Sequence, residues 1–175
     1  MTRSSFLLLD ANIVIQLFKS GAWQQFAANA QIQIARTVLG EAHYFENEHG
    51  ERVDFDLNVD VAAGVVDVVE VGLRELEGFL NQFDPSYAEK LDPGEAESLA
   101  YLMKAPRETR ICSADAIVFR VLGNLDRGEQ GLSLEEALDE VGLGRKLPSQ
   151  FGRKFRSDYT AKGVAEWMQG RGVKR

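Results

Sequence analysis

Short apolar runs alternate along the chain with longer segments in which apolar residues recur every three or four positions. Residues 6–9 form an apolar run that stops at Asp10, which predicts a buried strand. Residues 11–18 place their apolar side chains on one helical face, so we expect a helix there. Continued in this way, the pattern predicts strands at 31–35, 64–71 and 109–113, and helices at 22–30, 38–45, 73–83, 94–104, 116–125, 133–141 and 159–169.

Local signals mark where several of these elements begin and end. Ser133 with Glu136 three residues later has the pattern of a capping box, which predicts the start of a helix. Pro85 is expected to close the helix over residues 73–83. The charged segment 47–56 reads as a loop or a small hairpin around His49 and Gly50. Strands that alternate with helices in this order indicate an α/β fold with a parallel sheet.

The composition describes a folded protein without a disulfide framework. The length of 175 residues fits one domain, and a hydrophobic content of 45% excludes global disorder. The single cysteine, Cys112, excludes a disulfide-stabilised secreted scaffold. The opening apolar run is far too short for a membrane span or a signal segment. We therefore expect a cytoplasmic protein with no membrane partner.

The formal net charge of −7 hides an asymmetry along the chain. Residues 145–175 hold nine Lys/Arg and two acids, a net of +7, whereas residues 1–144 carry a net of −14. The total charge argues against a nucleic-acid partner, but a basic tail on an acidic body indicates contact with a polyanion or with an acidic partner. A solvated terminal segment is the alternative. We accordingly expect a domain over residues 1–147 and a basic C-terminal extension over residues 148–175.

Two aspartates directly follow predicted strands. Asp10 ends the first apolar run, and Asp115 follows the predicted strand over residues 109–113. In open parallel sheets, ligands bind beyond the carboxyl ends of the strands. Two carboxylates at one such edge repel each other unless a cation such as Mg²⁺ or Mn²⁺ lies between them. Each aspartate alone is also a favoured helix N-cap, so the metal-site prediction depends on the pair.

Two further acidic positions belong to predicted helices. Glu41 lies early in the helix that follows the strand over residues 31–35, again at the outgoing edge of a strand. Glu95 and Glu97 are two residues apart on the helix over residues 94–104 and therefore do not share a face. At about 100° per residue, Glu95 lies closer to the apolar stripe of this helix, so it is the better candidate to point inward. Glu97 stays open as its substitute.

Four segments resemble, in order, the motifs of PIN-domain nucleases, including toxin ribonucleases of the VapC type. Residues 7–12 (LLLDAN) are similar to the family's first strand with its terminal Asp. Residues 37–41 (TVLGE) resemble the second acidic position, residues 93–100 (PGEAESLA) a Gly-Glu-containing helix, and residues 111–115 (ICSAD) the late strand that ends in Thr/Ser-x-Asp. The matched region covers about residues 4–125.

The resemblance implies a three-layer α/β/α nuclease that uses Mg²⁺ or Mn²⁺. Asp10, Glu41, Glu95 and Asp115 would be the catalytic, metal-holding acids, and Asn12 and Ser113 would support them. The implied activity is hydrolysis of RNA, and small proteins of this family often act as toxins of type II toxin–antitoxin pairs. We therefore expect RNA as substrate, an antitoxin as possible partner and a homodimer as the assembly.

Three alternatives follow from the same residues. A non-catalytic PIN-like module would bind nucleic acid or protein without cleaving it, and a nuclease of the same fold would cut DNA. A different Mg²⁺ protein, such as a receiver or a phosphatase, is a third class. Receivers place paired acids after the first strand, whereas here Ala11 and Asn12 follow Asp10.

Overall fold

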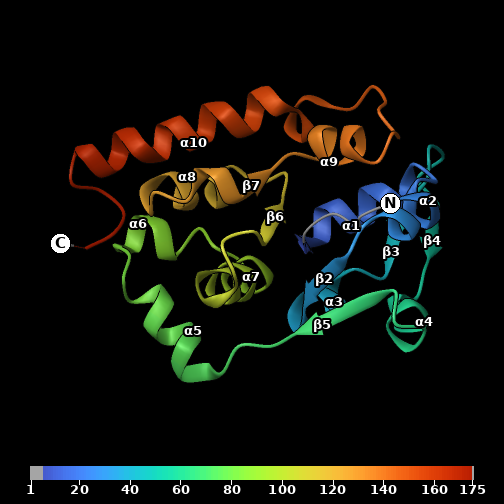
Figure 1. The fold of residues 1–175 in the computed structure, drawn as a ribbon, viewed down its shortest axis with the longest axis horizontal. Coiled ribbons are helices and arrows are strands. Elements are labelled where there is room, and N and C mark those ends of the chain that lie inside the picture. The colour runs from blue at the N-terminus through green and yellow to red at the C-terminus, as the bar shows by residue number, and fades with distance from the viewer. Residues whose placement is uncertain (1–5, 175) are drawn as a thin grey trace.

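The computed structural model describes residues 6–174, which form a parallel five-stranded sheet covered by helices on both faces (Figure 1). The spatial order of the strands is β5-β2-β1-β6-β7, and each neighbouring pair is parallel. The predicted α/β/α sandwich around a parallel sheet is therefore confirmed. The strands are β1 (Leu7–Leu9), β2 (Ile32–Ala35), β5 (Val66–Val69), β6 (Arg110–Cys112) and β7 (Gly131–Leu132).

The predicted helices are present with several shifted ends, and two short helices, α4 and α6, are added to them. Between residues 6 and 174, no helix is both long and apolar enough to cross a membrane. The helices are α1 (Ala11–Lys19), α2 (Trp23–Asn29), α3 (Arg36–Glu41), α4 (Leu57–Ala62), α5 (Leu73–Leu80), α6 (Pro85–Ala88), α7 (Pro93–Lys104), α8 (Ala116–Asn124), α9 (Leu134–Glu140) and α10 (Arg153–Met168), with 3-10 turns η1 (Gly128–Gln130) and η2 (Ser149–Phe151).

The alternation of side chains along β1 divides the hydrophobic core into two parts. Leu7 and Leu9 pack in a cluster with α1, α2 and α9, whereas Leu8 packs in a second cluster with residues of α5, α6, α7 and α8. A parallel strand that is buried on both faces has no polar positions to alternate with. This explains why the first strand reads as an unbroken apolar run.

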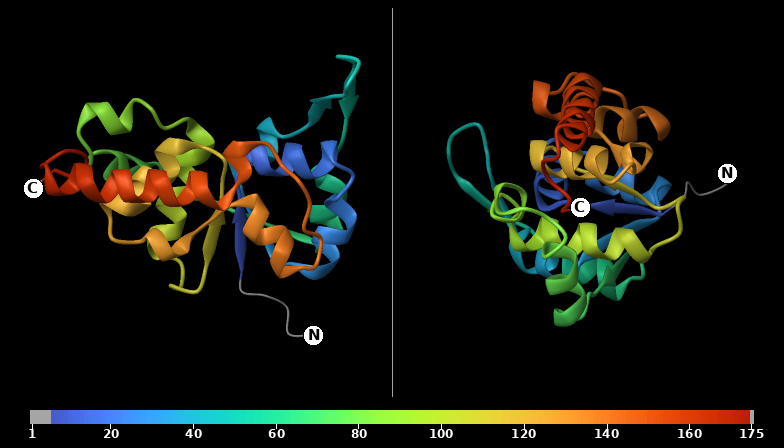
Figure 2. Two further views of the ribbon diagram at one scale, coloured as in Figure 1. Left: turned by 90° about the horizontal axis from the view of Figure 1, so that it is seen from above. Right: turned by 90° about the vertical axis from the view of Figure 1, so that its left-hand side faces the viewer.

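The segment after β2 differs from its prediction. The expected helix over residues 38–45 begins two residues earlier and ends at Glu41, and Tyr44–Glu46 forms strand β3 instead. Strand β3 pairs with β4 (Arg52–Asp54) in an antiparallel hairpin, as the charged segment around His49 and Gly50 suggested. Aromatic residues favour strands, and Gly50 takes a positive φ of 75° in the turn. Figure 2 shows the hairpin projecting away from the body of the protein.

Two short helices outside the predicted set each begin at an aspartate that caps them. The carboxylate of Asp56 accepts a hydrogen bond from the amide of Asn58 (2.9 Å) and starts α4, where the short apolar run from Val59 does not distinguish helix from strand. Asp84 caps α6 in the same way by accepting from the amide of Ser86 (3.0 Å). Pro85 therefore begins a helix as its first residue instead of only closing the previous one.

Helix α10 begins six residues before its predicted start and lies along α8 (Figure 1). Gly123 and Gly163 allow this close approach, because a Cβ at either position would lie 2.1 Å from a backbone oxygen of the other helix. Buried between the helices, the guanidinium of Arg120 donates two hydrogen bonds of 3.0 Å to the carboxylate of Glu166. The phenol of Tyr87 donates to the same carboxylate. Most of the expected C-terminal extension is thus packed against the body.

Candidate functional site

Asp10 and Ser113 lie side by side at the carboxyl edge of the sheet. They directly follow β1 and β6, whose last residues, Leu9 and Cys112, are paired in register. The Ser113 hydroxyl donates to Asp10 Oδ2 (2.9 Å) and accepts from the amide of Asp115 (3.0 Å). The structure therefore brings the two predicted aspartates to one edge and links them through Ser113. Each also caps a helix, by accepting from the amides of Ala11 (2.7 Å) and Ile117 (3.0 Å) respectively.

Glu95 reaches the same edge from the first turn of α7. Its Oε2 accepts from the amide of Asp92 (3.0 Å), and Asp92 Oδ1 accepts from the amide of Glu95 (2.8 Å). This capping box turns the Glu95 side chain back toward the start of the helix, where it is 2% exposed. Asp92 was missed as a site residue, although its position three residues before Glu95 is the sequence signal of a capping box.

Glu41 lies at the end of α3, against the start of α7. A Cβ at Gly94 would lie 3.0 Å from Glu41 Oε2 and 3.6 Å from Asp92 Oδ1, so the absence of a side chain at residue 94 leaves room for these carboxylates. Burial, and then the negative charge of Asp92, raise the pKa of Glu41. We call Asp10, Glu41, Asp92, Glu95 and Asp115 the carboxylate cluster.

Glu95 and Glu97, the two alternative site residues on α7, are both buried but face different partners. Glu95 interacts electrostatically with Asp10 and Asp115. Glu97, which is 7% exposed, instead accepts a hydrogen bond at Oε2 from the amide of Thr37 at the start of α3 (2.9 Å). Of the two predicted supporting residues, Ser113 bridges the aspartates, whereas Asn12 lies exposed in the first turn of α1.

Burial and neighbouring negative charges raise the pKa values of three members of the carboxylate cluster, Asp10, Glu41 and Glu95. Burial raises the pKa of Asp10 to about 6, against the lowering effect of its hydrogen bond with Ser113. Burial, followed by the charges of Asp10, Asp115 and Asp92, raises the pKa of Glu95 to about 9 even though the Asp92 amide lowers it. A divalent cation would relieve this repulsion, and oxygen-only donors are those that Mg²⁺ and Mn²⁺ prefer.

The donor set fits such a cation only in part. Among residues 6–174, no three His, Cys, Asp or Glu side chains come close enough together to form a ready metal-binding group. Water would have to complete the coordination of a cation held by these carboxylates, as is usual for Mg²⁺.

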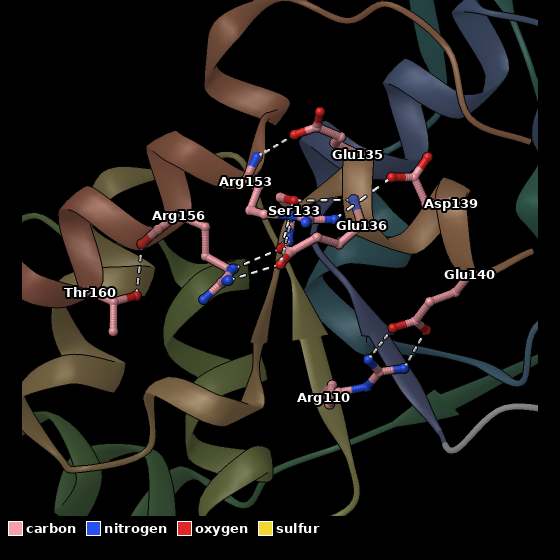
Figure 3. A network of polar contacts seen from close by, with 9 residues as sticks. All are labelled: Arg110, Ser133, Glu135, Glu136, Asp139, Glu140, Arg153, Arg156 and Thr160. Carbon is pink, nitrogen blue, oxygen red and sulfur yellow. Dashed lines mark hydrogen bonds and ion pairs between the residues drawn. The ribbon is translucent and has the colours of Figure 1, made fainter.

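Two basic residues of the C-terminal segment, Arg153 and Arg156, pair with acids of α9 (Figure 3). The Arg156 guanidinium donates two hydrogen bonds, of 2.7 and 2.8 Å, to the carboxylate of Glu136. The Arg153 amide donates to Glu135 (2.6 Å), and its guanidinium lies 3.8 Å from Asp139. Two of the nine basic residues of this segment therefore balance charges of the body, so the +7 counted along the sequence overstates what a polyanion would meet.

The buried hydroxyl of Ser98 affects the stability of the fold. Ser98 on α7 is fully buried, and its Oγ finds no hydrogen-bond partner within residues 6–174. A buried polar group without a partner costs about 1–3 kcal/mol. We expect Ser98→Ala to raise the free energy of unfolding by about 1 kcal/mol in urea titrations. Ser113→Ala should lower it, because that hydroxyl makes two hydrogen bonds; a loss of stability in Ser98→Ala would contradict the assignment.

Comparison of the sequence with protein-family models and with curated proteins finds no match. The likeness to PIN-domain nucleases therefore consists of the four motifs and their order along the chain.

Proposed function

We propose that the protein is a metal-dependent endoribonuclease that hydrolyses phosphodiester bonds of RNA with Mg²⁺ or Mn²⁺. The observation that carries the proposal is the convergence of Asp10, Glu95 and Asp115, from three separate elements, at the carboxyl edge of a parallel sheet. Buried like charges destabilise a fold, and perturbed carboxyl pKa values of this kind gather at functional sites. The resemblance to the PIN-domain motifs points to the same chemistry.

In this function, some residues of the site would hold the cation and others would orient them. Asp10, Asp115, Glu95 and Glu41 would hold the cation, partly through water. When bound, the cation would supply an activated water and stabilise the charge on the leaving oxygen. Ser113 would fix the orientation of Asp10 through its 2.9 Å hydrogen bond, and Asp92 would fix that of Glu95. Glu95 must lose its proton before it can act as a ligand, so the cation and the proton compete for it.

By analogy with small proteins of the PIN family, we further propose that the protein is the toxin of a type II toxin–antitoxin pair and forms a homodimer. An antitoxin would then be its protein partner. A small open reading frame that abuts or overlaps the gene would support this role, whereas an isolated gene would favour a nuclease without an antitoxin.

One observation favours a second candidate, a non-catalytic PIN-like binding module. Within residues 6–174, no three His, Cys, Asp or Glu side chains are arranged to bind a metal ion. A module with an incomplete metal site would have this property. The two candidates differ in one measurable property, because only the nuclease requires the cation.

The experiment that tests the proposal is a cleavage assay on purified protein. Labelled single-stranded and structured RNAs are incubated with Mn²⁺ or Mg²⁺, and DNA strands of the same sequence serve as the control for substrate class. We expect cleavage of RNA that stops in excess EDTA and returns when Mn²⁺ is added beyond the chelator. Cleavage of DNA alone would assign the DNA-directed alternative, and neither cleavage nor Mn²⁺ binding by calorimetry would favour the module.

A further inference from the structure

Helix α3 begins without a capping side chain of its own. The residue at its N-cap is Ala35, whose side chain has no polar atom to accept a hydrogen bond from the first free amides. Helix α7 supplies the missing acceptor, because Glu97 Oε2 lies 2.9 Å from the amide nitrogen of Thr37. The cap therefore comes from a residue 60 positions further along the chain, and its negative charge also favours the helix N-terminus.

A second contact between α3 and α7 lies at the candidate site itself. Gly94, in the first turn of α7, packs so closely that a Cβ there would lie 3.2 Å from Val38 Cγ2 and 3.0 Å from Glu41 Oε2. The hydrogen bond between Glu97 and Thr37 and the Gly94 contact thus join the same two helices. Since α3 spans only Arg36–Glu41, we expect a displacement of its first turn to shift its last residue, Glu41, as well.

We propose that Glu97 is a positioning residue that holds Glu41 in the carboxylate cluster by capping α3 from α7. This inference rests on the proposed function, in which Glu41 helps to hold the cation. It assigns the two glutamates of α7 different tasks: Glu95 faces the cation, and Glu97 orients the helix that carries another ligand. Residues that orient metal ligands typically contribute about 10- to 100-fold to metal affinity.

The test compares Glu97→Gln with Glu97→Ala. Glutamine retains an oxygen that can accept from the Thr37 amide, whereas alanine does not. We expect Glu97→Ala to weaken Mn²⁺ binding, measured by calorimetry, by about tenfold and to slow RNA cleavage, with Glu97→Gln close to the wild type. A metal ligand would give the opposite pattern, because the neutral amide would fail as badly as alanine. Equal losses in both variants, or no loss in Glu97→Ala, would overturn the proposal.

Hydrogen exchange of the Thr37 amide provides a readout that does not depend on catalysis. We expect fast exchange in Glu97→Ala and protection in Glu97→Gln. The matched control is Glu95→Gln, which should lose Mn²⁺ binding while its Thr37 amide stays protected. If the wild type binds no Mn²⁺ and cuts no RNA, the proposed function fails and the positioning role fails with it. If the wild type binds Mn²⁺ and Glu97→Ala binds it equally well despite fast Thr37 exchange, only the positioning role fails.

Discussion

Replacing Asp10 by asparagine should abolish the proposed RNA cleavage, with a fall of at least about 100-fold in the single-turnover rate, while the fold is retained. Asparagine has nearly the same shape and keeps an oxygen that can accept from the Ala11 amide, so the cap of α1 survives. The variant lacks the negative charge at the centre of the carboxylate cluster. Charge stabilisation by a catalytic cation amounts to several kcal/mol, and each 1.4 kcal/mol corresponds to about tenfold in rate.

The matched control for this substitution is Asp67→Asn. Asp67 is an exposed aspartate in the edge strand β5, so its replacement removes the same charge without touching the carboxylate cluster. We expect Asp67→Asn to cut RNA like the wild type, and circular dichroism should show both variants folded. Full activity in Asp10→Asn would mean that this edge of the sheet does not perform the reaction.

Replacing Glu95 by glutamine should stabilise the metal-free protein, and the gain should grow as the pH rises. The folded protein raises the pKa of Glu95 from 4.5 to about 9. Below pH 4.5, the Glu95 carboxyl is protonated in both the folded and the unfolded chain, so its ionisation has no effect on the free energy of unfolding. Between pH 4.5 and 9, the unfolded chain loses the proton while the folded protein keeps it, and stability falls with rising pH. By pH 7 the loss amounts to up to about 3 kcal/mol, which glutamine avoids.

Urea unfolding between pH 5 and pH 9 in EDTA measures this gain. The wild type should lose stability across that range, and Glu95→Gln should lose less. Glu48→Gln in the exposed hairpin controls for the change in net charge. Saturating Mn²⁺ should stabilise the wild type but not Glu95→Gln, because a ligand that binds only the folded state shifts the unfolding equilibrium. A variant less stable than the wild type at pH 8 would show that the Glu95 carboxylate has a partner that neutralises it.

The fold was predictable because its strands and helices have distinct patterns. The sheet edge that carries Asp10 and Asp115 follows from two apolar runs and the rule for parallel strands. Strand β7 has only two residues, too few to show any pattern. Tyr44 and Phe45 continue the helical spacing of α3 in the sequence, and only their pairing with Arg52–Asp54 makes them a strand.

The surroundings of the site were less predictable, because they depend on contacts between distant segments. The angular position of Glu97 places it away from the apolar stripe of α7, yet α3 covers that face and buries it. Likewise, counting charges in the C-terminal segment does not reveal that Arg156 would meet Glu136. Asp92 reads as a helix cap, and its proximity to Glu41 appears only once α3 lies on α7.

The wide separation of Asp10 and Asp115 along the chain has a consequence for synthesis on the ribosome. Strand β1 lies between β2 and β6, so a nascent chain that has exposed only its first hundred or so residues lacks β6 and the Ser113 hydroxyl that joins the two aspartates. The hydrogen bonds from Arg120 and Tyr87 to the Glu166 carboxylate form later still, because Glu166 is translated after both residues. For the proposed ribonuclease, this order would complete the carboxylate cluster only late in translation. The messenger RNA from which the protein is being translated would then be protected from cleavage.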